Sequence, residues 1–378
     1  MNTAHDTQSN VSRLVAANND LGFRLLSQLV KQDPDKNLFL SSFSVAIALA
    51  MAYNGAEGET KRAMAQVLGL AGLGLQEVNA ANAAFMSMQG ALDPKVHLAV
   101  ANSIWVGKGI ELAPDFVQRI RDYYAGDVAN VDFHQPGAAD IINKWVAGKT
   151  HDKIRGVVTP EVVKSAILIL INAIYFKGIW TRQFDEEETE ERAFTLLDGS
   201  RKQHPMMSQS GYYDYFENES FQAVSLPYGE GRISMYVFLP KPTVSIGEFQ
   251  QALTTDNWQQ WMSRFYWMEG DLVLPRFKVE YGVDLLPNLV ALGGRELAGV
   301  DSLGMGAGPV AISNVIHKAF VEVNEEGTEA AAVTAVVVVF SPEPRFRMIV
   351  DRPFFCAICD NETGALLFMG FVVNPMQS

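Results

Sequence analysis

Residues 324–344 read NEEGTEAAAVTAVVVVFSPEP, and the two halves of this stretch favour different secondary structures. The first half is rich in Glu and Ala, which suit a helix, whereas the second half is a valine run that favours a sheet and is closed by proline. If it stayed exposed, the uncharged apolar run 336–340 would be prone to aggregate. The sequence therefore predicts that this stretch either is a permanent strand or becomes one.

Strand alternation predicts which side chains of this stretch face inward, provided that Glu329 stays on a solvated face. The inward positions are then Thr328, Ala330, Ala332, Thr334, Val336 and Val338. The first of these side chains are small. A strand that arrives late needs small inward groups to slide between strands that are already packed over a core.

The first 150 residues have mostly helical patterns. Residues 11–30 carry leucines at helical spacing, and residues 42–53 are almost entirely apolar, which predicts a buried helix. Further helices are predicted over 60–68, 76–92, 114–124 and 136–149.

Strand patterns dominate from residue 165 onward. Residues 165–176 form an apolar run interrupted only at Asn172, as expected of a central strand that is buried on both faces. Further strands are predicted over 96–105, 233–239, 271–274, 310–323, 346–350, 354–359 and 366–373. Early helices followed by late strands, without strict alternation, indicate an α+β architecture in one interwoven domain.

Composition excludes several classes of protein. The chain has 378 residues, of which 48% are hydrophobic, and a formal net charge of −13. Its apolar runs are far shorter than the ~18 residues that a membrane helix needs, so no membrane span is expected. Its acidity argues against nucleic acid as the main partner. Residues 1–10 lack the layout of a secretory signal, so we expect a chain that is either cytosolic or secreted in mature form.

The sequence contains no recognisable catalytic or metal-binding motif, and we expect neither a cofactor nor a metal. The only two cysteines, Cys356 and Cys359, are three positions apart in a strand and so point to opposite faces, which predicts two packing residues. The acidic run 185–191 is predicted to be a solvated turn. Of the six histidines, only His317 lies in an apolar strand pattern.

Ordered stretches along nearly the whole chain resemble the serpin family. They are NLFLSSFS (37–44), NAIYFKGIW (172–180), LPRF (274–277), HKA (317–319), the segment 325–335, RPFF (352–355) and FMGFVVNP (368–375). One departure is Ser42, where the family usually has proline. The resemblance implies a single serpin-type domain over residues 1–378, with a large central mixed β-sheet, further β-sheets and about eight or nine helices. It also implies an exposed reactive-centre loop over 325–344.

The resemblance further implies a function, since serpins are suicide inhibitors of serine proteases. A target protease cleaves the exposed loop and forms an acyl-enzyme. The cut loop then inserts into the main sheet as a new strand, which drags the tethered protease across the molecule and stalls deacylation. On this hypothesis the partner is a serine protease held in a 1:1 covalent complex, and the chain is a metastable monomer that tends to polymerise through its loop.

The family pattern assigns roles to particular residues. The hinge that enters the sheet would consist of Glu325, Glu326, Gly327, Thr328, Glu329, Ala330, Ala331 and Ala332. The shutter, a polar cluster beneath the sheet where strands must part, would consist of Ser41, Ser44, Asn172 and His317. Trp180 would lie at the breach, where the loop first enters the sheet, although it could also be an ordinary core aromatic.

Two considerations give different positions for the bond that a protease would cut. The usual family spacing of seventeen residues from Glu325 ends at Ser341, but the next residue is Pro342, and most serine proteases cleave poorly before proline. We therefore expect cleavage between Phe340 and Ser341 by a chymotrypsin-like protease, with an elastase-like cut after Val339 as the alternative. Two other functions remain open at this point: a non-inhibitory serpin that acts as a chaperone or carrier, and a cross-class inhibitor of cysteine proteases.

Overall fold

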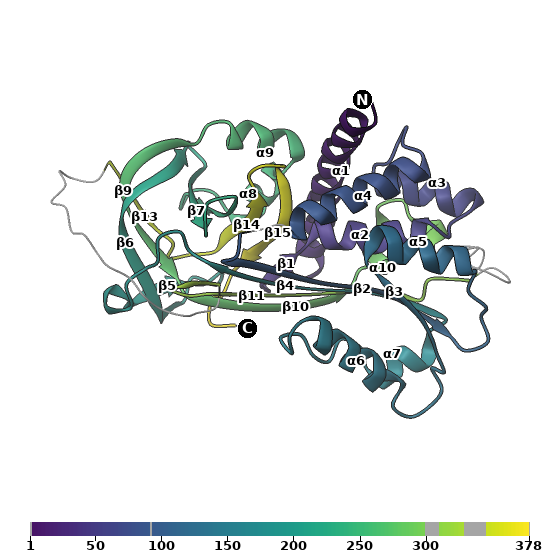
Figure 1. Cartoon of the computed structure of the whole chain (residues 1–378). Coiled ribbons are helices and arrows are strands. Elements are labelled where there is room, and N and C mark those ends of the chain that lie inside the picture. Colours follow the sequence, from purple (N-terminus) through teal and green to yellow (C-terminus); the bar gives the residue numbers. More distant parts are fainter. Residues whose placement is uncertain (1, 91–92, 299–309, 329–344, 378) are drawn as a thin grey trace.

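A computed structural model describes residues 2–90, 93–298, 310–328 and 345–377 of the chain. The described residues form ten α-helices, two short 3₁₀ helices and strands that are arranged in two sheets (Figure 1). The predicted α+β class with a large mixed sheet is therefore confirmed. The expectation of one domain over the whole chain stays a prediction.

The helices are concentrated in the first half of the chain. Their bounds are α1 Asn2–Gln32, α2 Ser42–Tyr53, α3 Gly58–Val67, α4 Leu75–Gly90, α5 Pro114–Tyr124, α6 Ala138–Lys149, α7 Pro160–Ser165, α8 Ile246–Ala252, α9 Thr255–Met262 and α10 Leu286–Ala291. Two 3₁₀ helices follow at Glu186–Glu188 and Arg295–Ala298. Every residue of α2 is buried, as its apolar sequence predicts.

The six-stranded sheet has the order β10-β11-β4-β2-β3, with a short sixth strand, β12, paired to β4. Its strands are β2 Val96–Gly107, β3 Asp127–Val131, β4 Leu168–Ile179, β10 Phe277–Asp284, β11 Asn314–Val323 and β12 Gly327–Thr328. It is a mixed sheet, because β11 runs parallel to β4 and β2 runs parallel to β3, whereas β2 and β4 are antiparallel.

The remaining strands form one continuous nine-stranded sheet in place of several separate ones. Its strands are β1 Leu38–Leu40, β5 Glu190–Thr195, β6 Arg201–Glu217, β7 Phe221–Tyr228, β8 Ile233–Pro240, β9 Tyr266–Pro275, β13 Phe346–Ile349, β14 Phe354–Asp360 and β15 Ala365–Val372. The long strand β6 joins its two parts, since its first half pairs with β5 and its end pairs with β7.

Strand β4 is buried on both faces, which explains its apolar sequence. Its alternate residues, such as Ile169 and Ile171, pack in a cluster with α6, whereas Leu170 and Ile174 face the main core that includes α2. Figure 1 shows α6 and α7 below the six-stranded sheet and α2, α4 and α5 above it. Asn172 is therefore on the α2 side of a strand that has no solvated face.

The structure corrects several predictions at the level of elements. Residue 165 ends α7 instead of opening β4, and β11 begins only at Asn314. The acid side chains of the run 185–191 are exposed, as predicted, but residues 186–188 form a 3₁₀ helix instead of a turn and the last two residues belong to β5. The two cysteines are free and buried, as predicted, and burial raises the pKa of the Cys356 thiol to about 12. Among the described residues, no helix is long and apolar enough to cross a membrane.

Candidate functional site

The chain leaves β11 through a tight turn and comes back onto β4. The Asn324 amide donates to the Gly327 carbonyl (2.9 Å), and the Gly327 amide donates to the Asn324 carbonyl (3.2 Å). The Asn324 side-chain oxygen also accepts from the amides of Glu326 and Gly327, both at 3.2 Å. Residues 324–328 are thus ordered by their own backbone, immediately before the segment 329–344, which lies outside the described residues.

Gly327 can only be glycine at this position. Its φ is +142°, a conformation that L side chains rarely adopt, and a Cβ atom built there would lie 2.1 Å from the Gly178 carbonyl oxygen. This close approach lets Gly327 and Thr328 pair antiparallel with Ile179 and Gly178 of β4. Both residues of β12 are therefore part of the six-stranded sheet.

Thr328 lies inside the sheet with no exposed surface. Its hydroxyl is 3.1 Å from the hydroxyl of Tyr228, another fully buried residue. Because an unpaired buried hydroxyl would be costly, each of these two groups stabilises the other in this position.

Strands β4 and β11 fork at this point. They pair directly from Asn314 with Ile169 to Phe320 with Tyr175, and β12 takes up its own pairing with β4 only from Gly178 upward. The sheet is closed below the fork and parted above it, and Thr328 occupies the parted end. A longer strand could continue from Thr328 only if the seven direct register pairs below it opened.

Trp180 fixes the upper end of the fork. Its indole nitrogen donates to the Asn324 carbonyl (2.9 Å), and its backbone amide donates to the Glu326 carbonyl (2.9 Å). Its ring stacks on Tyr228 with centroids 4.2 Å apart and planes at 13°. Only 2% of Trp180 is exposed, so this aromatic contacts the first residues of the returning segment directly and is also part of the core.

Glu325 is a buried carboxylate in the same turn. It is 2% exposed and accepts from the Arg276 Nε atom at 2.6 Å and from the Thr189 hydroxyl. Its backbone carbonyl accepts from the Phe184 amide (2.8 Å). The turn is thereby tied to the 3₁₀ segment and to the connection between β9 and β10.

The four predicted shutter residues lie together beneath the closed part of the sheet. The Nδ1 atom of His317 is 2.5 Å from the Asn172 side-chain oxygen, and its Nε2 atom accepts from the Ser41 amide at 3.3 Å. Asn172 also donates to Ser44, and the Ser44 amide donates to the Ser41 hydroxyl, which caps α2. The Nδ1–H tautomer of a neutral imidazole satisfies both ring contacts.

Asn102 of β2 is a fifth member of this cluster that the sequence analysis missed. Asn172 donates to its side-chain oxygen (2.6 Å), and the two residues are register partners. The only sequence signal was a polar residue in an apolar strand next to Ser103. Without the register there was no means of placing it beside Asn172.

Burial lowers the pKa of His317 to about 3, although a backbone hydrogen bond with Phe39 partly opposes this shift. The imidazole is therefore neutral in the closed sheet at neutral pH. Protonation would place an uncompensated charge on a side chain with no exposed surface, so it would favour any state in which the strands separate.

The other predicted site residues lie in the segment 329–344. The hinge residues Glu329, Ala330, Ala331 and Ala332, the bait residues Phe340 and Ser341 and the alternative bait Val339 all lie outside the described residues. Within the described ranges, no group of three or more His, Cys, Asp and Glu side chains could hold a metal ion.

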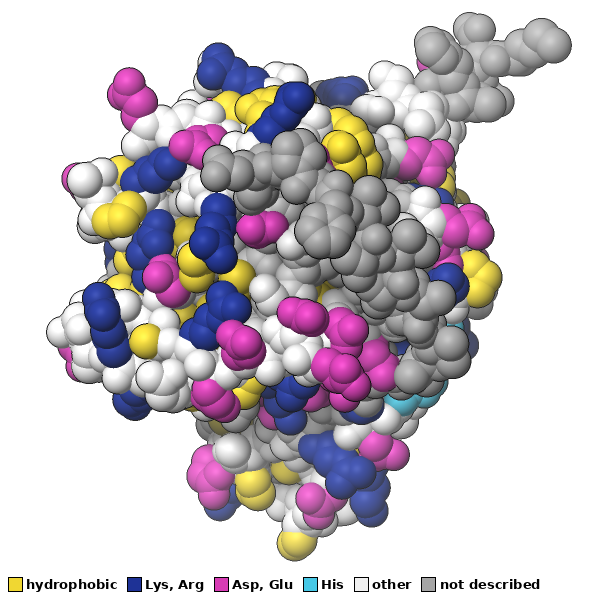
Figure 2. Space-filling model, turned by 90° about the vertical axis from the view of Figure 1, so that its left-hand side faces the viewer, with side chains coloured by type: hydrophobic (Ala, Val, Ile, Leu, Met, Phe, Trp, Pro, Cys, Tyr) yellow, Lys and Arg dark blue, Asp and Glu magenta, His cyan; other side chains and the backbone are white. Residues whose placement is uncertain are grey.

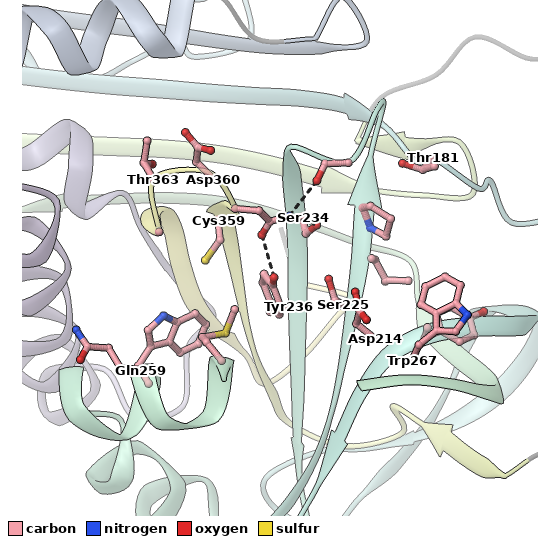
Figure 3. A pocket seen from close by; sticks show the side chains of 18 of the residues that line it. Thr181, Asp214, Ser225, Ser234, Tyr236, Gln259, Trp267, Cys359, Asp360 and Thr363 are labelled. Carbon is pink, nitrogen blue, oxygen red and sulfur yellow. Dashed lines mark hydrogen bonds between the residues drawn. The ribbon is translucent and has the colours of Figure 1, made fainter. Parts of the chain in front are cut away.

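A cavity of about 840 Å³ has Trp180 in its lining. Figure 3 shows that Gln259 of α9, Tyr236 and Ser234 of β8, and Asp214 and Trp267 border it. The Tyr236 hydroxyl and Ser234 are linked through Asn361 at 2.9 and 2.8 Å. The wall thus combines aromatic and polar side chains.

Comparisons with known proteins agree on one family. The family model described as "Serpin (serine protease inhibitor)" matches residues 16–375. Human neuroserpin is 34% identical over 370 residues, which cover 94% of this chain and 90% of neuroserpin. The structure of native protease nexin-1 with heparin has a TM-score of 0.86 at 30% identity and covers 97% of this chain and all of the other. The structure of human thyroxine-binding globulin with bound thyroxine has a TM-score of 0.90 at 26% identity, and the match covers 97% of this chain and 99% of the globulin.

Acidification tests the role of His317. Because its pKa is lowered in the folded state from the ordinary 6.5 to about 3, the unfolded chain binds more protons between these values, and stability falls as the pH drops below about 6.5. We expect the urea midpoint of the wild type to fall between pH 7 and 4.5 by the equivalent of about 2–3 kcal/mol.

The variant His317→Gln should lose most of this pH-dependent component, although it is less stable at pH 7. His97→Gln, at an exposed position on β2, is the matched control and should keep the wild-type dependence. An identical loss of stability on acidification in wild type and His317→Gln would contradict the assignment.

Charge reversal at Glu325 tests the buried ion pair. In Glu325→Lys, a buried ammonium faces Arg276 without a carboxylate, so we expect a loss of about 2–3 kcal/mol, reduced by the partial exposure of Arg276. Urea unfolding measures the loss, and size-exclusion chromatography after mild heating should detect more polymer. The control is Glu186→Lys on the exposed part of the acidic run, and equal behaviour of both variants would refute the prediction.

Proposed function

The chain belongs to the serpin family, whose members are generally protease inhibitors and not enzymes, and we propose that this one inhibits serine endopeptidases by trapping them as acyl-enzymes. The observation that carries the proposal is the position of Thr328. A small residue, buried at the top of a fork between two strands, is the start that an inserting strand requires.

The proposed reaction begins as ordinary proteolysis. The protease serine attacks the carbonyl carbon of Phe340, the bond to the nitrogen of Ser341 breaks, and Ser341 leaves as a new amino terminus while Phe340 remains as an ester on the enzyme. The released end is then free to move. Residues after Thr328 extend β12 downward between β4 and β11 and carry the protease with them.

The register of β12 predicts where each inserted residue would lie. Continuing the pairing of Gly327 with Ile179 and Thr328 with Gly178 places Thr334 opposite Asn172. Antiparallel partners share a face, so the Thr334 hydroxyl would lie next to Asn172 in the shutter. Insertion between β4 and β11 would at the same time break the hydrogen bond between His317 and Asn172. Val336 and Val338 would then lie opposite Leu170 and Leu168 over the core.

Backbone pairing favours the inserted state. The parallel pairing of β4 with β11 would be replaced by two antiparallel ladders, one on each side of the new strand. Each added hydrogen bond contributes about 1 kcal/mol net. The valine run, an aggregation hazard when exposed, would become a buried strand.

Two other functions are less well supported. A carrier role has one observation in its favour, the cavity of about 840 Å³, together with the likeness to thyroxine-binding globulin. A carrier does not require small inward residues in the hinge, yet Thr328, Ala330 and Ala332 are all small. Inhibition of cysteine proteases would use the same insertion and differ only in the acyl bond, a thioester.

The proposed function is tested by incubation with α-chymotrypsin and with elastase. We expect an SDS-resistant 1:1 complex. Cleavage of the loop without any complex would overturn inhibition and leave a carrier or chaperone role.

Charge at the first inward position tests the hinge. In Thr328→Arg, a guanidinium cannot be buried against Tyr228, so β12 leaves the sheet and insertion after cleavage is slowed. We expect the stoichiometry of inhibition to rise several-fold, since hydrolysis of the acyl-enzyme then outruns trapping.

Glu329→Arg is the matched control for this test, because the continued register places residue 329 opposite Lys177, a partly exposed residue at the upper end of β4. It should inhibit with nearly the wild-type stoichiometry. An unchanged stoichiometry in Thr328→Arg, or an equal rise in both variants, would refute the proposed register.

Phe340→Ala tests the proposed bait. We expect it to slow inhibition of chymotrypsin-like proteases at least tenfold, because their primary pocket binds a large apolar side chain, and to affect elastase-like proteases much less. Mass spectrometry of the released fragment should place the wild-type cut by chymotrypsin between Phe340 and Ser341. A cut elsewhere in the loop would contradict the assignment of Phe340 as the bait residue.

A further inference from the structure

Exposed aromatic side chains are concentrated at one end of the nine-stranded sheet. Among the described residues, seven large hydrophobic side chains are exposed, and the three aromatic ones are Tyr212 (53%), Tyr266 (50%) and Trp267 (68%), on β6 and β9. Tryptophan is seldom left this open on a surface, and in protein interfaces it is among the residues that contribute most to binding.

Tyr212 and Trp267 form a preassembled pair. Their rings stack with centroids 5.9 Å apart and planes at 14°. They belong to the same face of the sheet, because Tyr212 is the register partner of Glu269 and Trp267 is the partner of Asp214. Side chains held in place before a partner arrives lose less conformational entropy on binding.

Carboxylates flank this aromatic pair. Asp214 is exposed beside Trp267, as Figure 3 shows, and the Tyr212 hydroxyl is 3.4 Å from a carboxylate oxygen of Glu269. Two arginines also belong to this face: Arg347 is the register partner of Asp271, and the exposed Arg345, two residues earlier, is beside Glu269. Asp214 is on β6, which β9 separates from these arginines. An aromatic surface between carboxylates suits a guanidinium or ammonium group, through cation–π contact and charge-assisted hydrogen bonds.

The same face adjoins the point where the chain returns from residues 329–344. The Arg345 amide donates to the Glu269 carbonyl (3.1 Å), and β13 then pairs with β9. The proposed bait is four to six residues before Arg345, within at most ~20 Å of extended chain. A protease domain is wider than the ~30 Å of a small domain, so one that holds the bait would lie close to this end of the sheet. Figure 2 views that end and shows hydrophobic side chains among charged ones on its surface.

We propose that the face of β6 and β9 that borders the cavity, around Tyr212, Asp214, Trp267 and Glu269, is a second contact surface for the target protease, which places a surface arginine or lysine against Trp267. This proposal rests on the proposed inhibitory function and adds the chemistry of the partner to it. The surface speeds the encounter that presents the loop to the protease active site, and it takes no part in strand insertion.

The test separates encounter from trapping. The second-order rate constant for attack on the loop is measured with α-chymotrypsin and neutrophil elastase, two basic proteases, as loss of intact chain, whether the product is complex or cleaved protein. We expect Trp267→Ala to lower this constant at least fivefold with at least one of the two proteases. Asp214→Asn should lower it less and should weaken its decline with ionic strength. The stoichiometry of inhibition should not change.

Tyr266→Ala is the matched control. Tyr266 is also exposed (50%) and adjacent to Trp267 in sequence, but it is the register partner of the buried Tyr215 and so belongs to the other face of β9. Its side chain lies outside the proposed contact surface, so the rate constant of Tyr266→Ala should remain within twofold of the wild type. Thermal unfolding of each variant verifies that the fold is retained.

Two results would overturn the proposal: rate constants for Trp267→Ala within twofold of the wild type with both proteases, or an equal fall in Tyr266→Ala. Failure of the inhibitory function has a different signature. If the wild type is cleaved without forming a complex, the function fails, while a fivefold slower cleavage of Trp267→Ala would still support the contact surface.

Discussion

The direct parallel pairing of β4 with β11 is the constraint on which the rest of this structure depends. It closes the six-stranded sheet from Asn314 to Phe320, and the polar cluster around His317 and Asn172 lies beneath it. A parallel pair is slightly less stable than an antiparallel one, and this pair has an antiparallel competitor at its upper end, where β12 is already in place. The closed sheet is therefore one of two packings that the same strands allow.

The turn at residues 324–328 holds β12 at the upper end of β4. Glycine at position 327 permits the close approach to Gly178, Glu325 ties the turn to Arg276, and the ring of Trp180 covers Tyr228. These contacts hold residues 324–328 against the upper end of β4 and against Tyr228. Each residue of the polar cluster around His317 and Asn172 is hydrogen-bonded within it, so separating β4 from β11 would cost those bonds.

Sequence reasoning predicted the architecture well wherever one pattern dominated. The apolar runs of α2 and β4 could be recognised because both elements are buried all round. Short helices such as α8, which depends on the capping box of Ser245 and Glu248, carry too few residues for periodicity to reveal them. Strand β6 escaped prediction although exposed Tyr212 and Asp214 alternate with buried Tyr213 and Tyr215, and Asn102 could join the shutter only once the register was known.

The most direct measurement of the central claim is the thermal unfolding of the chain before and after a single cut in residues 329–344. Roughly ten new backbone hydrogen bonds at about 1 kcal/mol each, with ~2 °C per kcal/mol for a chain of this size, give an expected rise of about 20 °C in the midpoint of the nicked protein. A nicked protein that unfolds at or below the temperature of the intact one would contradict the account, because it would mean that the closed sheet is already the most stable packing.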